Sequence, residues 1–373
     1  MKELILVFLR LGFTSFGGPA AHIAMMEAEF VRRLKWLTRT QFLDLLGAAS
    51  LIPGPSSSEM AIYIGQQRGG WRGLILGGVC FICPAALIVG TIAWFYVNFS
   101  SLPVLTGILY GIKPVIIAIV LQAVIGLLKT AVRTRFLAIL GIAALVVAAS
   151  GVSIPLLLLG AGVLSSLRLL ISRRGWISIS VLLFSKQALA VPSIVEKVPV
   201  TLSRIGLFFL KIGALQFGSG YVLLAFLRAD LVERWHWLTE AQLLDAIAVG
   251  QFTPGPVFTT ATFIGFLLKG VPGAIVATVA IFLPAFILVA MSGSLIPRLR
   301  RSVVAGAFLD GVIVTSLALM VLVTWQLGRS SLIDFTTFFI AAISLLGLIR
   351  FRFNSAWLIL MGGAIGYIMF PRK

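Results

Sequence analysis

The sequence is poor in charge, cysteine and histidine. Charged residues fill 11% of its 373 positions, whereas roughly a quarter is usual in soluble domains, and hydrophobic residues fill 60%. Two cysteines (Cys80, Cys83) and two histidines (His22, His236) do not supply the set of about four ligands that a structural metal site needs. These shortages exclude a soluble domain and a disulfide scaffold, and we expect no metal and no other cofactor.

Acidic residues are scarcer than basic ones. Twelve acids stand against 30 Lys and Arg, which gives a formal net charge of +18. Most of the basic residues lie in short segments between apolar runs, where the positive-inside rule places them. The expected partner is therefore the lipid bilayer, and no nucleic acid is expected. No catalytic triad or phosphate-binding loop is recognisable either, so the sequence predicts neither an enzyme nor an ATP-driven pump.

Long apolar runs fill most of the chain. A membrane-spanning helix needs about 20 such residues, and the runs are continuous, whereas a β-barrel would show alternation. The sequence predicts an all-α polytopic membrane protein with roughly ten to fourteen helices, some of them broken. The clearest predicted spans are Leu74–Val97, Leu102–Leu128, Ile154–Ile171, Ala274–Ser292 and Val303–Trp325.

The chain contains two copies of one pattern. A shift of 201 residues aligns Phe8–Pro55 with Phe209–Pro256 without a gap, with 18 identities in 48 positions. Basic segments in one copy match segments of the other that are neutral or of mixed charge: Val31–Thr40 has four basic residues, and Val232–Ala241 mixes both signs. Because Lys and Arg set orientation, the copies are predicted to be inverted repeats, residues 1–172 and 204–373, joined by a linker at 173–203.

Glycine and proline interrupt each copy twice, at matching positions. The first breaks are Phe16–Pro19 and Phe217–Gly220, and the second are the Pro-Gly-Pro motifs at 53–55 and 254–256. A capping box at Thr38, repeated at Thr239, starts a helix ahead of each Pro-Gly-Pro, and proline ends it. Inverted repeats with such broken helices are typical of secondary transporters.

The breaks predict an anion site, because helix N-termini carry free N–H donors and partial positive charge. The alternative is a kinked structural helix with serine as an ordinary N-cap. The predicted substrate-binding residues are Gly17, Gly18, Pro19, His22, Pro53, Gly54, Pro55, Ser56, Ser57, Ser58, Gly218, Ser219, Gly220, Tyr221, Pro254, Gly255, Pro256 and Thr259. The polar donors favour the first copy, because Val257 and Phe258 replace two of the serines in the second.

Charged residues within apolar runs are costly and functional by default. Glu59 is a candidate proton carrier or a partner of the helix dipole, and Lys113 is a partner of Asp310 or of substrate. Asp44 and Asp245 have an alternative role in pairing with Lys or Arg, and Arg10 and Lys211 in reaching the interface. The predicted coupling or charge-relay residues are thus Glu59, Asp44, Asp245, Lys113, Asp310, Arg10 and Lys211.

The motifs FLRLGFTSFGGPAAHI, IPGPSSSEMAIYIGQQRGGWRG and WLTEAQLLDAIAVGQFTPGPVFTTATFIGF resemble the chromate ion transporter family of bacteria and archaea, over nearly the whole chain. The resemblance implies export of the chromate dianion across the cytoplasmic membrane and chromate resistance, with sulfate as a similar competitor. Ala49-Ser50 departs from the family's Cys-Gln, and Gly218-Ser219-Gly220 from Gly-Gly-Gly. A transporter of sulfate or another anion and a channel-like protein remain alternatives. Transport direction, coupling ion and oligomeric state, a homodimer included, stay open.

Overall fold

The computed structural model describes residues 1–16, 18–99, 103–150, 152–174, 198–216, 223–351 and 353–369. Every regular element in these ranges is a helix, and five helices are long and apolar enough to cross a membrane. These five contain or largely overlap the predicted spans, which confirms an all-α polytopic membrane protein. They are Ser56–Phe99, Gly107–Leu128, Ile154–Ile171, Val257–Ser292 and Val303–Ser331.

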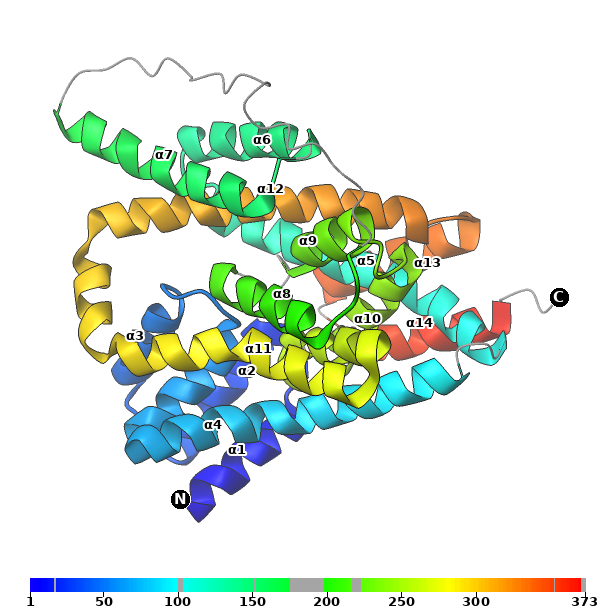
Figure 1. Ribbon diagram of the computed structural model, residues 1–373, viewed down its shortest axis with the longest axis horizontal. Helices are drawn as coiled ribbons and strands as arrows, with labels where there is room; N and C mark the ends of the chain where they lie inside the picture. The colour runs from blue at the N-terminus through cyan, green and yellow to red at the C-terminus, as the bar shows by residue number, and fades with distance from the viewer. Residues whose placement is uncertain are drawn as a thin grey trace.

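The two repeats contain matching series of helices (Figure 1). Repeat one comprises α1 (Lys2–Thr14), α2 (Gly18–Glu27), the π-helix η1 (Ala28–Arg33), α3 (Arg39–Ala49), α4 (Ser56–Phe99), α5 (Pro103–Ala131), α6 (Arg135–Ala149) and α7 (Ile154–Arg174). Repeat two comprises α8 (Leu202–Leu215), α9 (Leu223–Phe226), the π-helix η4 (Leu227–Arg234), α10 (Glu240–Phe252), the 3₁₀ turn η5 (Val257–Thr259), α11 (Thr260–Arg301), α12 (Val303–Ser331), α13 (Phe335–Leu346), the π-helix η6 (Gly347–Phe351) and α14 (Ser355–Met369).

The helices ahead of the Pro-Gly-Pro motifs begin where the sequence predicts. The Thr38 hydroxyl accepts the Gln41 N–H at 3.2 Å, and the Gln41 side chain accepts the Thr38 N–H in return. Thr239 and Gln242 form the same capping box at the start of α10. Reciprocal caps satisfy N–H groups that a helix start leaves unpaired, so both predicted starts are confirmed.

Each long helix reverses direction soon after its Pro-Gly-Pro motif. Gly70 (φ +55°) and Gly270 (φ +59°) adopt left-handed backbone conformations that interrupt α4 and α11, and glycine adopts them without steric cost. The chain then folds back, so that Gly65 lies against Gly73 in α4. The half-helix after each Pro-Gly-Pro is therefore a short re-entrant segment, and a long helix follows it.

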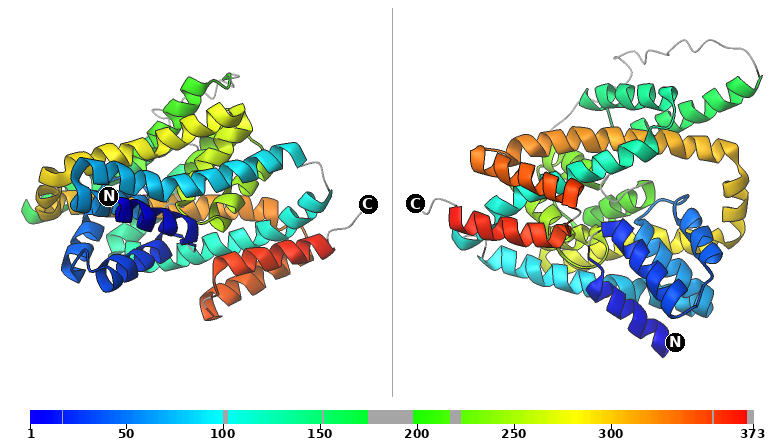
Figure 2. Two further views of the ribbon diagram at one scale, coloured as in Figure 1. Left: turned by 90° about the horizontal axis from the view of Figure 1, so that it is seen from below. Right: turned by 180° about the vertical axis from the view of Figure 1, so that it is seen from behind.

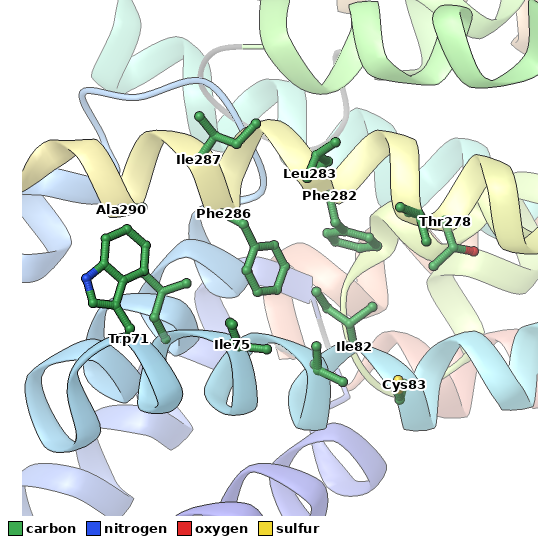
Figure 3. Close-up of a pocket in the computed structure, with 13 residues that line it drawn as sticks. Trp71, Ile75, Ile82, Cys83, Thr278, Phe282, Leu283, Phe286, Ile287 and Ala290 are labelled. Atoms are coloured by element: carbon green, nitrogen blue, oxygen red, sulfur yellow. The ribbon is translucent and has the colours of Figure 1, made fainter. Parts of the chain in front are cut away.

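The repeats are antiparallel and intertwined. The long helices α4 and α11 pack side by side in opposite directions, so that Trp71 lies near Ala290 and Cys83 near Thr278 (Figure 3). The helix α14 lies along α5 (Figure 2), and α7 packs against α12, so the last helix of each repeat contacts the other repeat. This arrangement confirms inverted repeats. The boundaries at 172 and 204 stay predictions, and residues 175–197 of the linker lie outside the described ranges.

Candidate functional site

Each Pro-Gly-Pro loop is bound to the opposite repeat by a backbone hydrogen bond, and the two bonds are reciprocal. Gly54 N–H donates to the Gln216 carbonyl at 2.7 Å, and Gly255 N–H donates to the Ser15 carbonyl at 2.8 Å. Ser15 and Gln216 occupy matching positions, just past the ends of α1 and α8. Each loop therefore binds the end of the first helix of the other repeat, which brings together breaks that lie far apart in the sequence.

Both loop glycines have backbone conformations that disfavour other residues, with φ +144° at Gly54 and φ +90° at Gly255. A Cβ atom at Gly255 would lie 2.6 Å from the Cβ of Ala85 in α4, and one at Gly54 would lie 3.5 Å from the Cβ of Ala285 in α11. It would also contact the carboxylate of Glu59. Glycine is thus needed at both positions for the backbone conformation, and at Gly255 also for close contact with the opposite repeat.

The first turn after the loop of repeat one is polar and enclosed. Ser57, Ser58 and Glu59 are 1%, 0% and 0% exposed. The two serine hydroxyls and both carboxylate oxygens lack a hydrogen-bond partner among the described residues. A buried polar group without a partner costs on the order of 1–3 kcal/mol, and a charged one more. Such a cluster at a helix N-terminus indicates a ligand-binding site.

The matching turn of repeat two is also buried but satisfied locally. The Thr259 hydroxyl donates to the Pro256 carbonyl and the Thr260 hydroxyl to the Val257 carbonyl, each at 2.8 Å. Phe258 takes the position that matches Ser57 and is fully buried. In this turn repeat two therefore contributes backbone and an apolar wall, while the hydroxyls that lack a partner among the described residues lie in the matching turn of repeat one.

His22 lies beside the second loop. Its ring is 1% exposed and packs edge-on against Phe81, with ring centroids 5.9 Å apart. The ring also lies near the backbone of Ser15, whose carbonyl accepts Gly255 N–H. His22 therefore touches the predicted site. Gly18 begins α2, next to Pro19, but the predicted residues Gly17, Gly218, Ser219, Gly220 and Tyr221 lie outside the described ranges.

Lys113 does not pair with Asp310, which is one of its two predicted partners. Lys113 Nζ lies 3.1 Å from Asp245 Oδ1, whereas Asp310 forms no ion pair with any described residue. The pairing of Lys113 with Asp310 is therefore wrong, because α5 packs against α10 and faces its aspartate. The sequence reasoning also missed Tyr96, whose hydroxyl donates to Asp245 Oδ2 at 2.8 Å. A single tyrosine hydroxyl within an apolar run was the available signal.

The other charged candidates lie away from the loops. Asp44 is exposed, in contrast to its buried counterpart Asp245. Arg10 pairs with Glu29, and Lys211 pairs with Asp230. These two pairs occupy matching positions in the repeats and join the first helix of each repeat to its π-helix.

A groove between the repeats is almost entirely apolar and does not suit an anion. It has a volume of about 480 Å³ and lies between α4 and α11 (Figure 3). Leu74, Ile82, Phe282 and Phe286 are typical of its lining. An apolar lining offers no hydrogen-bond donors, so the candidate anion site remains the buried turn after Pro55.

Comparison with known proteins identifies the family. The chromate transporter family model matches residues 2–166 and 203–367, one match in each repeat. The chain is 33% identical to a chromate transport protein of Cupriavidus metallidurans, over 100% of this chain and 94% of that protein. It is also 33% identical to a probable chromate transport protein of Synechococcus elongatus, over 93% and 89% of the two chains, and 29% identical to a chromate transport protein of Pseudomonas aeruginosa, over 100% and 93%.

No solved structure matches the chain. The paired family matches coincide with the two inverted repeats and include both Pro-Gly-Pro loops. This multi-pass membrane protein, built from two antiparallel copies of one helical unit, belongs to the chromate transporter family.

Proposed function

We propose that this protein is a secondary transporter that exports chromate across the cytoplasmic membrane, with the dianion bound at the N-terminus of α4. The observation that carries the proposal is the set of buried hydroxyls of Ser57 and Ser58, which have no partner among the described residues. Serine hydroxyls and the positive end of a helix together favour a tetrahedral oxyanion.

The carboxyl group of Glu59 lies at the proposed anion site, and its protonation state affects binding of the dianion. The carboxylate is fully buried, one turn from the loop, and no cation pairs with it among the described residues. A dianion beside an ionised carboxylate would be repelled strongly at low dielectric. We therefore propose that chromate binds when Glu59 carries a proton, so that one proton and one dianion cross together.

The proposed stoichiometry sets the driving force for export. A proton with a dianion moves a net charge of −1, and each elementary charge gains about 2.3 kcal/mol per 100 mV of membrane potential. A potential that is negative inside the cell therefore drives the loaded carrier outward. An opposing proton gradient slows export, since the proton leaves with the anion.

Flux in proteoliposomes tests the proposal. Purified protein should carry labelled chromate down an imposed potential with saturable kinetics, and sulfate should compete if the site recognises any tetrahedral dianion. Protein that moves neither anion under any combination of potential and pH gradient would falsify the oxyanion assignment. Flux that rises without saturation would indicate a channel instead.

Substitution of Glu59 tests the proton. Glu59→Gln keeps the size of the side chain and supplies a permanently neutral group, so transport should continue while the shift of reversal potential with pH gradient disappears. Glu59→Asp keeps a titratable carboxyl group and is the matched control that should retain the shift. An unchanged pH response in Glu59→Gln removes Glu59 from coupling and leaves the anion site intact.

A further inference from the structure

A second buried polar cluster joins the two repeats away from the proposed anion site. Lys113 of α5 and Tyr96 of α4, both in repeat one, bind the two carboxylate oxygens of Asp245 in repeat two, at 3.1 and 2.8 Å. Asp245 is 3% exposed. The carboxylate on α10 is therefore held from two sides by the opposite repeat.

Tyr96 also contacts the half-helix beyond the second Pro-Gly-Pro loop. Its ring lies 5.3 Å from the ring of Phe263, centroid to centroid, in an edge-on arrangement. Phe263 follows the loop on α11, and Asp245 precedes it on α10. Nine residues separate Asp245 from Pro254, roughly 13 Å along a helix. One tyrosine thus holds both half-helices that flank this loop, at a distance from the loop itself.

The positions that match this cluster around the first Pro-Gly-Pro loop hold different residues. Asp44, the counterpart of Asp245, is exposed, and the residues that match Lys113 and Tyr96 are Ile313 and Ile296. Isoleucine has no ammonium or hydroxyl group. The same three positions therefore cannot form this cluster around the first Pro-Gly-Pro loop.

We infer that Tyr96 and Lys113 are positioning residues that hold the second Pro-Gly-Pro loop as the fixed wall of the anion site, so that the first loop carries the motion of the transport cycle. This inference rests on the proposed function. Alternating access in inverted-repeat transporters moves one part against another around a shared site. A buried ion pair with further hydrogen bonds resists separation, because an unpaired buried charge is strongly unfavourable.

Hydrogen exchange of the full-length protein in nanodiscs tests the inference. Lys113→Met leaves the Asp245 carboxylate without its cation, and Tyr96→Phe removes one hydroxyl while it keeps the ring. Amide exchange in residues 240–263 should rise at least about tenfold in Lys113→Met, since a tenfold change corresponds to about 1.4 kcal/mol. It should rise a few-fold in Tyr96→Phe, as expected for the loss of one hydrogen bond, and exchange in residues 39–49 should stay unchanged in both variants.

Conservative and control variants separate positioning from a general loss of stability. Lys113→Arg keeps a cation and should restore slow exchange together with the maximal flux rate, and the exchanged pair Lys113→Asp with Asp245→Lys should restore part of both. Asp44→Asn, at the matching position, should leave exchange in residues 240–263 unchanged.

Two outcomes would overturn the inference: unchanged exchange in residues 240–263 for both Lys113→Met and Tyr96→Phe, or an equal rise throughout the protein. The readout does not depend on transport. Failure of chromate flux in the unsubstituted protein would reject the proposed function alone, whereas unchanged exchange would reject the positioning role alone.

Discussion

The two Pro-Gly-Pro loops share a backbone and differ in their side chains. Each glycine donates its N–H to the carbonyl at the end of the opposite repeat's first helix, at 2.7 and 2.8 Å. Beyond the first loop lie buried hydroxyls and a carboxyl group that lack partners among the described residues, and beyond the second lie threonines that bond their own backbone. The two loops thus share their backbone hydrogen bonds, and the turns that follow them differ in their polar side chains.

This difference shows that backbone groups and side chains are under different constraints in a duplicated membrane protein. Breaks within a membrane must pair their backbone groups with protein or line a wet cavity, and the crossed hydrogen bonds meet that demand in both repeats. The side chains face a different demand, since one anion needs one set of donors. In the proposed function, polar groups on repeat one supply that set, and Phe258 on repeat two forms an apolar wall beside it.

Removal of the hydroxyl groups that follow the first or the second Pro-Gly-Pro loop should produce the largest difference in chromate flux. The double variant Ser57→Ala with Ser58→Ala should lower kcat/KM for chromate flux at least about a hundredfold, because each of two hydrogen bonds to a charged group contributes about 1.5–3 kcal/mol. The matched variant Thr259→Val with Thr260→Val removes hydroxyls that bond only their own backbone, and its flux should fall less than about threefold. Equal losses in the two variants would show that the site is symmetric.

Alanine substitutions at the two loop glycines should lower the stability of the protein by different amounts, and this contrast should be smaller than the one in flux. Gly255→Ala places a Cβ 2.6 Å from that of Ala85 on a packed helix, at φ +90°, and should destabilise the protein by about 2–3 kcal/mol. Gly54→Ala should cost less, because its new methyl contacts the movable end of the Glu59 side chain and Ala285 lies at an ordinary 3.5 Å. Thermal unfolding in detergent measures both.

A second substitution checks the cause of that loss. Ala85→Gly combined with Gly255→Ala should recover the part that comes from the clash and leave the part that comes from the backbone conformation. If Gly54→Ala proves the more damaging of the two, or if Ala85→Gly recovers nothing, close packing against the opposite repeat is not the reason for glycine at 255.

The smallest expected difference between the repeats is in how the stability of two matching helices, α6 and α13, depends on pH. Their N-terminal caps lie outside the five long membrane spans. Asp334 caps α13, whereas Thr134 caps α6 at the matching position. Slight burial raises the pKa of Asp334, but hydrogen bonds from Tyr110 and Thr337 outweigh it and hold the pKa below the usual 3.8. This stabilisation is fully present above pH 3.8 and is lost as pH falls through the lower folded-state pKa.

Hydrogen exchange at decreasing pH, corrected for the intrinsic rate, measures that difference. Protection of residues 335–346 should weaken on acidification below about pH 4, by less than about 1 kcal/mol because the group is exposed. Residues 135–149 should show no such weakening, since Thr134 does not titrate. Asp334→Asn is the control, because its protection should be independent of pH over the same range.

Much of the fold follows from local patterns. The long apolar runs predict the spans, the boxes at Thr38 and Thr239 predict helix starts, and the shift of 201 residues predicts two copies. Local rules also place the polar turn after Pro55. They do not indicate that the half-helices reverse at Gly70 and Gly270, because a glycine turn and a simple kink have the same sequence pattern.

The pairing of residues across the repeats could not be predicted. The sequence predicts Asp310 or substrate as the partner of Lys113, because Asp310 lies on the matching helix, yet α5 lies against α10 and Lys113 meets Asp245. The sequence does not indicate a role for Tyr96, because only a distant carboxylate gives its hydroxyl a partner. Such contacts depend on the crossing of long helices, and sequence periodicity has no information about that crossing.

The sequence by itself determined the membrane class, the duplication, the opposite orientation of the copies and the enrichment of polar groups after Pro55. These features are local, or they repeat along the chain. Only the tertiary structure decided that each loop binds the other repeat, at Ser15 and Gln216, and that Asp245 is buried while Asp44 is exposed. The reason is physical: two related sequences acquire different surroundings once they pack against each other, and those surroundings decide which side chains are buried and which are paired.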